Sequence, residues 1–254
     1  MRGVHSWLLF ALLVLPAGSP AGAQTNDAEH PGSIQFRVAY EQLSKGYAPW
    51  RSASLDVRGS GFSAAVEETT RFSQLDHNIT GGVQRHLASR LIVASEAGVS
   101  PSHHVSPTWG LAGRVELDAG AGWGLQASLQ HRRYTSASVD LSAMTVERYF
   151  SRWRAAYTLY LARLRGGEAS ASHRAQGDLY YGRSSNSVGV SVSTGDELEN
   201  LQPIGVLRTP VHAASVVGRQ WIAPTWCVEY DALVHEQGTF YTRRRVSVGL
   251  GYRF

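Results

Sequence analysis

The chain ends in a segment whose side chains alternate between apolar and polar. Successive side chains of a β-strand point to opposite faces, so a period of two indicates a strand with one apolar and one polar face. Similar alternation recurs along the chain, whereas the 3.6-residue period of a helix is weak. In the last segment the apolar phase is Val246, Val248, Leu250, Tyr252 and Phe254, and the polar phase is Arg243, Arg245, Ser247, Gly249, Gly251 and Arg253.

About fourteen such segments follow one another without a long crossover. Strands of about 10 residues, the length that crosses a bilayer, then leave connections of ordinary length. Twelve strands, the alternative, would leave long structureless loops. The predicted strands centre on residues 34–42, 50–58, 61–72, 79–88, 90–99, 109–118, 123–134, 141–150, 153–163, 171–182, 186–194, 211–222, 226–236 and 240–254.

The first 23 residues have the layout of a secretory signal peptide. Arg2 precedes an apolar run from Trp7 to Leu15, and small residues lead to Ala23. The run is about half the ~20 residues that a membrane-spanning helix needs, so we expect a cleaved leader and not an anchor. The predicted organisation is therefore a signal peptide at 1–23, a short lead-in at 24–32 and one β-barrel at 33–254.

Composition excludes several other classes of protein. The formal net charge of +4 is too small to indicate nucleic-acid binding. Cys227 is the only cysteine, so no internal disulfide can form, and the sequence has no zinc-ligand spacing. We therefore assign no cofactor, no metal site and no nucleic-acid partner.

The alternation does not itself say which face is buried. A soluble β-sandwich would bury its apolar phase, whereas a membrane barrel turns that phase to lipid and its polar phase inward. Alternating short and long connections favour the membrane barrel. The terminal Tyr252 and Phe254 resemble the signal by which outer-membrane proteins are recognised for insertion. Aromatic residues near strand ends are typical of two interfacial belts: Trp50, Trp109, Trp123, Tyr149, Trp153, Trp221, Trp226, Phe240 and Tyr252.

We therefore predict a single transmembrane, antiparallel, up-and-down β-barrel. An open edge would leave backbone groups unpaired in lipid, so the first strand must pair with the last. With an even number of strands, both termini lie at the end with the short turns. The lipid-facing phase of the first strand should be Ile34, Phe36, Val38 and Tyr40, beside the row from Val246 to Phe254.

Several short segments together point to a known family. They are Leu43–Tyr47 ahead of Trp50, Val146–Tyr149, Arg154–Tyr160, Gly195–Asn200, His235–Gly238 and Tyr241–Arg244. With these segments, the whole mature chain resembles the YaiO-type outer-membrane β-barrel proteins. The resemblance implies an outer-membrane location and a single barrel, and it implies no activity.

Candidate catalytic groups are few. A serine hydrolase needs a base beside its nucleophile and a third group that orients the base. Ser172 and His173 are neighbours and therefore lie on opposite faces of a strand. His103 and His104 fall in a predicted loop without an evident carboxylate. The pair Asp76–His77, in another predicted loop, is a possible water-activating pair at the outer rim. Solvated loop residues are the favoured interpretation in each case, so no catalytic residue is assigned.

The predicted loop at 195–210 collects oxygen ligands. Asp196, Glu197, Glu199 and Asn200 are the kind of side chains that bind Ca²⁺, but the spacing of an EF-hand is missing. An exposed acidic loop is the favoured interpretation.

Charged residues of both signs fall in the polar phase and should face the lumen. Buried charges need partners, so ion pairs that brace the wall are expected first, and a selectivity lining with weak anion preference second. Arg244, in the opposite phase from its neighbours, should reach the interface. The predicted lining is Arg114, Glu116, Arg132, Arg154, Arg174, Asp178, Glu229, Asp231, Arg243 and Arg245.

These patterns predict an integral protein of the Gram-negative outer membrane. Its expected role is passive passage of small polar solutes or a structural role in the envelope. The alternatives are a hydrolase or lipid-modifying enzyme with a site at the extracellular rim, and the barrel partner of a surface polysaccharide export system. Expected partners are outer-membrane lipid, lipopolysaccharide and, through the C-terminal strand, the barrel-assembly machinery.

Overall fold

The computed structural model describes residues 32–182, 186–201 and 205–254, and the side chains of 199–207 are left undescribed. The predicted signal peptide lies outside the described residues. Among these residues, no helix is long and apolar enough to cross a membrane. The strands are β1 (Ser33–Leu43), β2 (Trp50–Gly59), β3 (Phe62–Arg71), β4 (Gln74–Ala88), β5 (Leu91–Val99), β6 (Trp109–Gly120), β7 (Trp123–Arg133), β8 (Ser138–Phe150), β9 (Trp153–Leu164), β10 (Ala169–Tyr181), β11 (Asn186–Leu201), β12 (Gly205–Trp221), β13 (Trp226–Gln237) and β14 (Tyr241–Arg253).

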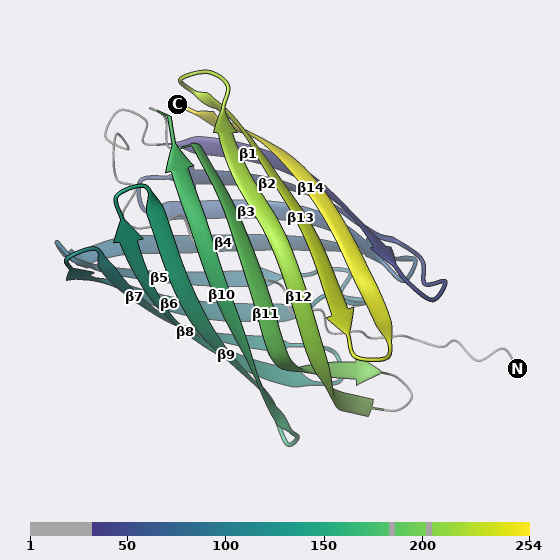
Figure 1. Ribbon diagram of the computed structural model, residues 1–254. Coiled ribbons are helices and arrows are strands. Elements are labelled where there is room, and N and C mark those ends of the chain that lie inside the picture. The colour runs from purple at the N-terminus through teal and green to yellow at the C-terminus, as the bar shows by residue number, and fades with distance from the viewer. Residues whose placement is uncertain (1–31, 183–185, 202–204) are drawn as a thin grey trace, which may run out of the picture.

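The strands form one closed barrel in which each strand pairs antiparallel with its neighbours in the sequence (Figure 1). Closure is made by β1 and β14, whose purple and yellow ribbons lie side by side. Every strand therefore has a partner on both sides, as a backbone surrounded by lipid requires. The predicted fourteen-strand, up-and-down barrel is confirmed, and twelve strands are not observed.

The register at the closure follows the two apolar phases. Phe36 is opposite Leu250, Val38 is opposite Val248 and Tyr40 is opposite Val246. Both ends of the barrel segment meet, because Gly32 and Phe254 exchange backbone hydrogen bonds of 3.1 Å. The predicted seam and its lipid-facing row are confirmed. We name the end of the barrel with these termini the terminal end and the opposite end the loop end.

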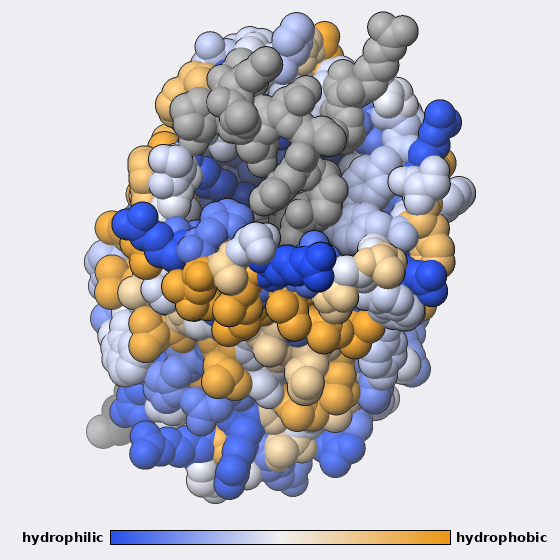
Figure 2. Space-filling model, turned by 90° about the vertical axis from the view of Figure 1, so that its left-hand side faces the viewer, coloured by the Kyte–Doolittle hydropathy of each residue, from blue (hydrophilic) through white to orange (hydrophobic). Residues whose placement is uncertain are grey.

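The apolar phase forms the outer surface of the barrel. Leu125, Val248 and Leu250 expose 42%, 54% and 43% of their surface, although a soluble β-sandwich would bury them. Figure 2 shows hydrophobic side chains gathered in a belt across the outer face, with hydrophilic residues on either side of it. A contiguous apolar belt of this kind is suited to hydrocarbon and not to water.

The connections differ from the predicted alternation at two places on the loop end. The long connection between β5 and β6 is present at residues 100–108, but β3 and β4 are joined by Phe72 and Ser73 alone, both with positive φ. The predicted loop at 195–210 is wrong as well, because β11 and β12 extend through most of it. Beyond the lipid neither strand face has to meet hydrocarbon, so an apolar–polar alternation is not required there.

The predicted aromatic belts are only partly correct. Trp109, Trp123, Trp153, Trp226 and Tyr252 are exposed on the outer face. The register instead places Trp50, Tyr149 and Trp221 in the inward phase, opposite Glu41, Arg154 and Cys227. Phe240, in the β13–β14 turn, packs against an inward-facing cluster. An aromatic residue at a strand end therefore does not reveal its face unless the phase of that strand is known.

Candidate functional site in the barrel lumen

All ten residues of the predicted lining lie in the inward phase. Six of them are buried, and Arg114, Glu116, Glu229 and Arg245 are partly exposed. The structure also confirms the alternation at the start of β14, where Arg243 is buried and Arg244 is exposed. Their role as the lining of a solute path stays a prediction.

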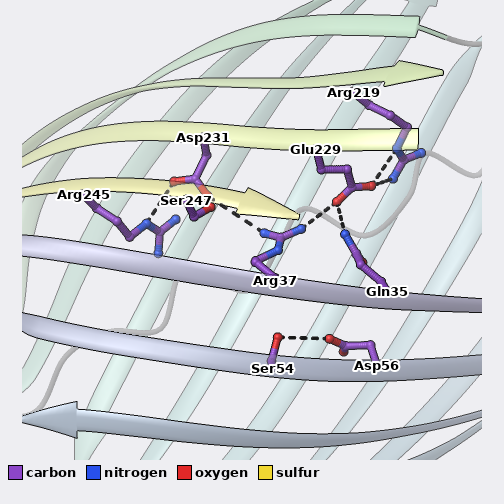
Figure 3. Close-up of polar contacts among 9 residues, drawn as sticks. All are labelled: Gln35, Arg37, Ser54, Asp56, Arg219, Glu229, Asp231, Arg245 and Ser247. Carbon is purple, nitrogen blue, oxygen red and sulfur yellow. Dashed lines mark hydrogen bonds and ion pairs between the residues drawn. The ribbon is translucent and has the colours of Figure 1, made fainter. Parts of the chain in front are cut away.

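Glu229 on β13 is the centre of a charged network on the inner wall (Figure 3). Arg219 on β12 donates to one carboxylate oxygen of Glu229 at 2.7 Å, and Arg37 on β1 donates to the other at 2.6 Å. Gln35 also donates to Glu229. The carboxylate thus accepts from two guanidinium groups and one amide, and these donors come from β1 and β12.

Asp231 continues the network toward the loop end. Arg245 on β14 donates to Asp231 at 3.0 Å, Ser247 donates to its other oxygen, and Arg37 lies 3.9 Å away. The signs therefore alternate through Arg219, Glu229, Arg37, Asp231 and Arg245, along the inner face of β12, β13, β14 and β1. We name this set the seam ladder, because it crosses the junction of the first and last strands.

A second charged network lies on the inner face of β8, β9 and β10. Arg154 donates to Glu147 and to Asp178, both at 2.8 Å. A Cβ at Gly189 would lie 2.1 Å from an oxygen of Asp178, so the missing side chain leaves room for this carboxylate. Removing one member of such a pair leaves a buried charge without compensation.

The sequence predicted part of these networks and missed the rest. Arg37, Arg219 and Glu147 carry ion pairs but were not among the predicted lining residues. Their signal was present, since each falls in the polar phase of its strand. What the sequence does not contain is which carboxylate each guanidinium meets, because that depends on the register between strands.

Further inward arginines lie outside these two networks. Arg114 pairs with Glu116 on the same strand at 2.8 Å, and Arg132 donates to Gln130 at 2.9 Å. Arg174 is buried, and its Nε has no hydrogen-bond partner in the described part of the chain.

An aromatic cluster occupies the inner wall at the loop end. Trp50 is 1% exposed and packs edge-on against Phe72, with ring centroids 5.1 Å apart. The guanidinium groups of Arg71 and Arg243 lie over its ring at 5.1 and 5.4 Å, and Arg243 also pairs with Glu41 at 3.2 Å. The cation–π contacts and this ion pair thus connect β1, β2, β3 and β14 at the loop end.

Asp76 anchors the β5–β6 loop to the inner wall. It is an inward residue of β4, 0% exposed, and the backbone N–H groups of His104, Val105 and Ser106 each donate to its carboxylate at 2.7 Å. The residue lies on the loop-end side of the exposed His77–Glu68 pair, outside the apolar belt. Burial raises the pKa of Asp76, but these hydrogen bonds outweigh it and lower the pKa to about 2.

The predicted Asp76–His77 pair is not formed. Asp76 points inward, whereas His77 lies in the opposite phase of β4, where it pairs with Glu68 at 3.3 Å. The carboxylate instead meets His104, whose Nδ1 lies 2.9 Å from Oδ1. The imidazole of His104 is half exposed, with its side chain 52% accessible. The sequence did not reveal the Asp76–His104 pair, because the two residues are 28 positions apart and meet only when the β5–β6 loop folds onto β4.

The acidic residues that the sequence predicts in a loop lie on the extended β11–β12 hairpin. Asp196 on β11 accepts a hydrogen bond of 2.6 Å from Arg208 on β12, while Glu197 is buried and lies 3.7 Å from His235. Within the described ranges, no group of three or more His, Cys, Asp or Glu residues is arranged to hold a metal ion.

The C-terminal aromatic residues lie on the outer face at the terminal end. Tyr252 stacks on Phe254, with ring centroids 6.3 Å apart, and contacts Trp226 of β13 at 4.8 Å. Their function as an insertion signal for the assembly machinery stays a prediction.

Solved structures with the same fold include outer-membrane channels, at very low sequence identity. An outer membrane channel from Pseudomonas putida F1 is 7% identical with a TM-score of 0.56, covering 88% of this chain and 96% of that one. The CymD monoaromatic hydrocarbon channel is 9% identical, with a TM-score of 0.53 and 87% of each chain covered. Omp33 of Acinetobacter baumannii is 8% identical, with a TM-score of 0.52 and coverage of 87% and 98%.

A comparison with curated proteins finds no match. The YaiO membrane beta barrel domain, however, matches residues 31–199, which reach from the start of β1 almost to the end of β11. The match covers well over half of the chain and falls on the first eleven strands of the closed barrel. The protein therefore belongs to the YaiO membrane beta barrel family and is an outer-membrane β-barrel.

Proposed function

We propose that this protein is a channel for small polar solutes across the outer membrane. The observation that carries the proposal is the seam ladder (Figure 3), because its charges lie inside the barrel and its guanidinium groups stay partly accessible. The side chains of Arg37 and Arg219 are 32% and 33% exposed, although they face inward. An ion-paired inner wall with accessible guanidinium groups is suited to a water-containing path.

The alternation of charge also suggests the selectivity of this channel. Each carboxylate of the seam ladder is flanked by guanidinium groups, so neither sign forms an uninterrupted row. Rings of one sign select the opposite ion, whereas mixed rows discriminate weakly. We therefore expect a channel with little preference between small anions and cations, and at most a weak preference for anions.

Conductance in planar lipid bilayers tests the proposal. The folded barrel should give discrete current steps, with a reversal potential close to zero in a KCl gradient. Glu229→Gln should shift the reversal potential toward anion selectivity, because it removes a negative charge between Arg37 and Arg219. Glu68→Gln, on the outer face, is the matched control and should leave the reversal potential unchanged. Absence of current steps from protein that is demonstrably folded would reject the channel.

A second candidate, hydrolysis at the loop end, has one observation in its favour. Asp76 holds His104 by its Nδ1, which also lies 3.2 Å from the carbonyl oxygen of Leu75. Two acceptors at Nδ1 favour the tautomer whose Nε2 carries a lone pair, as in a general base.

The test is hydrolysis of soluble acyl esters by the folded protein in detergent. His104→Ala should lower the rate by about 100-fold or more if the imidazole acts as a base. His77→Ala should have no effect, because His77 lies on the opposite face and pairs with Glu68. Equal rates in the wild type and in His104→Ala would eliminate this candidate.

A further inference from the structure

Arg174 differs from the other buried arginines of the barrel. In the part of the chain that the structure describes, four arginines are buried, namely Arg132, Arg154, Arg174 and Arg243. Arg154 has two carboxylate partners, Arg243 has Glu41 and the ring of Trp50, and Arg132 has Gln130. Arg174 has no hydrogen bond, ion pair or ring contact with any residue that the structure describes, and its Nε is buried. The residue is only 8% exposed.

The surroundings of Arg174 are neutral and rich in hydroxyl groups. Its cross-strand neighbours are Thr158 on β9 and Ser193 on β11, and the same inward face of β10 carries Ser172 and Gln176. Asp178, four residues along, is already engaged by Arg154 and Gln176. No carboxylate therefore lies at the positions that adjoin Arg174 on the described strands.

A buried guanidinium requires a compensating charge, and this wall does not supply one. The planar fork of arginine matches the two oxygens of a carboxylate or phosphate, and hydroxyl groups add further donors. We propose that Arg174, with Ser172, Thr158 and Ser193, forms a binding site for an oxyanion inside the barrel. The site deepens the proposed channel function, on which its physiological role rests, by naming the class of solute that pauses in the lumen.

Binding can be measured without conduction, by thermal unfolding of the full folded barrel in detergent. Phosphate or acetate, exchanged for chloride at constant ionic strength, should raise the unfolding temperature of the wild type. Arg174→Gln should lose that shift, and Arg174→Lys should keep part of it because the charge remains. Arg219→Gln is the matched control, since Arg219 is an inward arginine already paired with Glu229, and should keep the full shift.

The variants also report on the unpaired charge itself. Arg174→Gln should unfold at the same or a higher temperature than the wild type without added anion, because it removes an uncompensated cation. Arg154→Gln should unfold at a lower temperature, because Glu147 and Asp178 lose their partner. A lower unfolding temperature for Arg174→Gln would show that the charge has a structural partner and would overturn the proposal.

The remaining outcomes are distinguishable. A shift with phosphate alone assigns the site to phosphate groups, a shift with acetate alone assigns it to carboxylates, and a shift with both assigns it to oxyanions in general. Absence of any shift in the wild type, or an equal shift in Arg174→Gln, rejects the site. Stabilisation by anions in a barrel that gives no current steps would reject the channel and support the oxyanion site. Current steps without stabilisation by anions would support the channel and reject the oxyanion site.

Discussion

The face of the strand decides what a single arginine does in this barrel. Arg243 and Arg244 are neighbours in sequence, yet Arg243 is buried against Glu41 and Trp50, while Arg244 is exposed on the outer face opposite Gln42. Near the rim, a cation on the outer face costs almost nothing because it reaches water and headgroups. At mid-membrane the same cation would have to enter hydrocarbon. The position along the strand therefore matters as much as the face.

Val248→Arg tests this at one residue. Val248 lies on the outer face near the middle of β14, between Val38 and Tyr230. An arginine there should lower the free energy of unfolding in lipid vesicles by about 2–4 kcal/mol, whereas Thr242→Arg at the loop-end rim should cost close to zero. Urea unfolding followed by tryptophan fluorescence measures both. Equal stability of Val248→Arg and the wild type would contradict the assignment of this face to lipid.

At the scale of elements, some strands are longer than the apolar–polar alternation that predicts them. The alternation in β11 weakens after Val192, and Gly195 adopts φ 140°, yet the strand continues to Leu201. Similarly, β4 begins at Gln74, upstream of the predicted start at residue 79, and the polar His77 occupies the outer phase in between. These extensions are held by backbone pairing, not by lipid contact. Periodicity therefore locates the membrane-embedded part of each strand and underestimates its full length.

Asp76→Asn tests the anchoring of the β5–β6 loop. The asparagine keeps one acceptor oxygen and loses the charge, so hydrogen exchange at the amides of 104–106 should become at least ~10-fold faster at pH 7, in line with ~1.5–3 kcal/mol for a hydrogen bond to a charged group. Asp118→Asn is the control, since the carboxylate of Asp118 accepts a hydrogen bond from the backbone N–H of Gly120 in a turn, far from residues 104–106 in the sequence. Unchanged exchange at 104–106 in Asp76→Asn would show that the loop is held by other contacts.

The pH dependence of this anchor follows from the lowered pKa. A carboxyl whose folded pKa of about 2 lies below its unfolded value of roughly 3.9 stabilises the fold above the unfolded value. The contribution is lost as the pH falls through the folded pKa. The exchange rates of the three amides in the wild type should therefore show the same degree of protection at pH 5 and pH 8, after correction for intrinsic exchange.

For the whole molecule, closure joins residues that are far apart in sequence. Arg37 and Glu229 are 192 positions apart, and their ion pair exists only because β1 lies beside β14. Contacts of such separation carry a high entropic cost during folding, so the seam is expected to form late. The seam ladder then adds side-chain interactions at the one junction that no turn connects.

The sequence by itself determined the architecture of this protein. A period of two, repeated about fourteen times with apolar residues in one phase, admits few structures besides a closed barrel, because lipid leaves no unpaired edge. The same phase placed Arg154, Asp178, Glu229 and Asp231 inside the barrel.

Only the tertiary structure decided which inward charges meet. Register and loop folding give Arg154 two carboxylates, bring Asp76 to His104 and leave Arg174 without a partner among the described residues. The face on which a side chain lies is a local property of its strand. Which charged side chains form an ion pair depends on neighbouring strands, whose residues can be far away in the sequence. The physical reason is that phase follows from backbone geometry within one strand, and partnership follows from closure of the whole barrel.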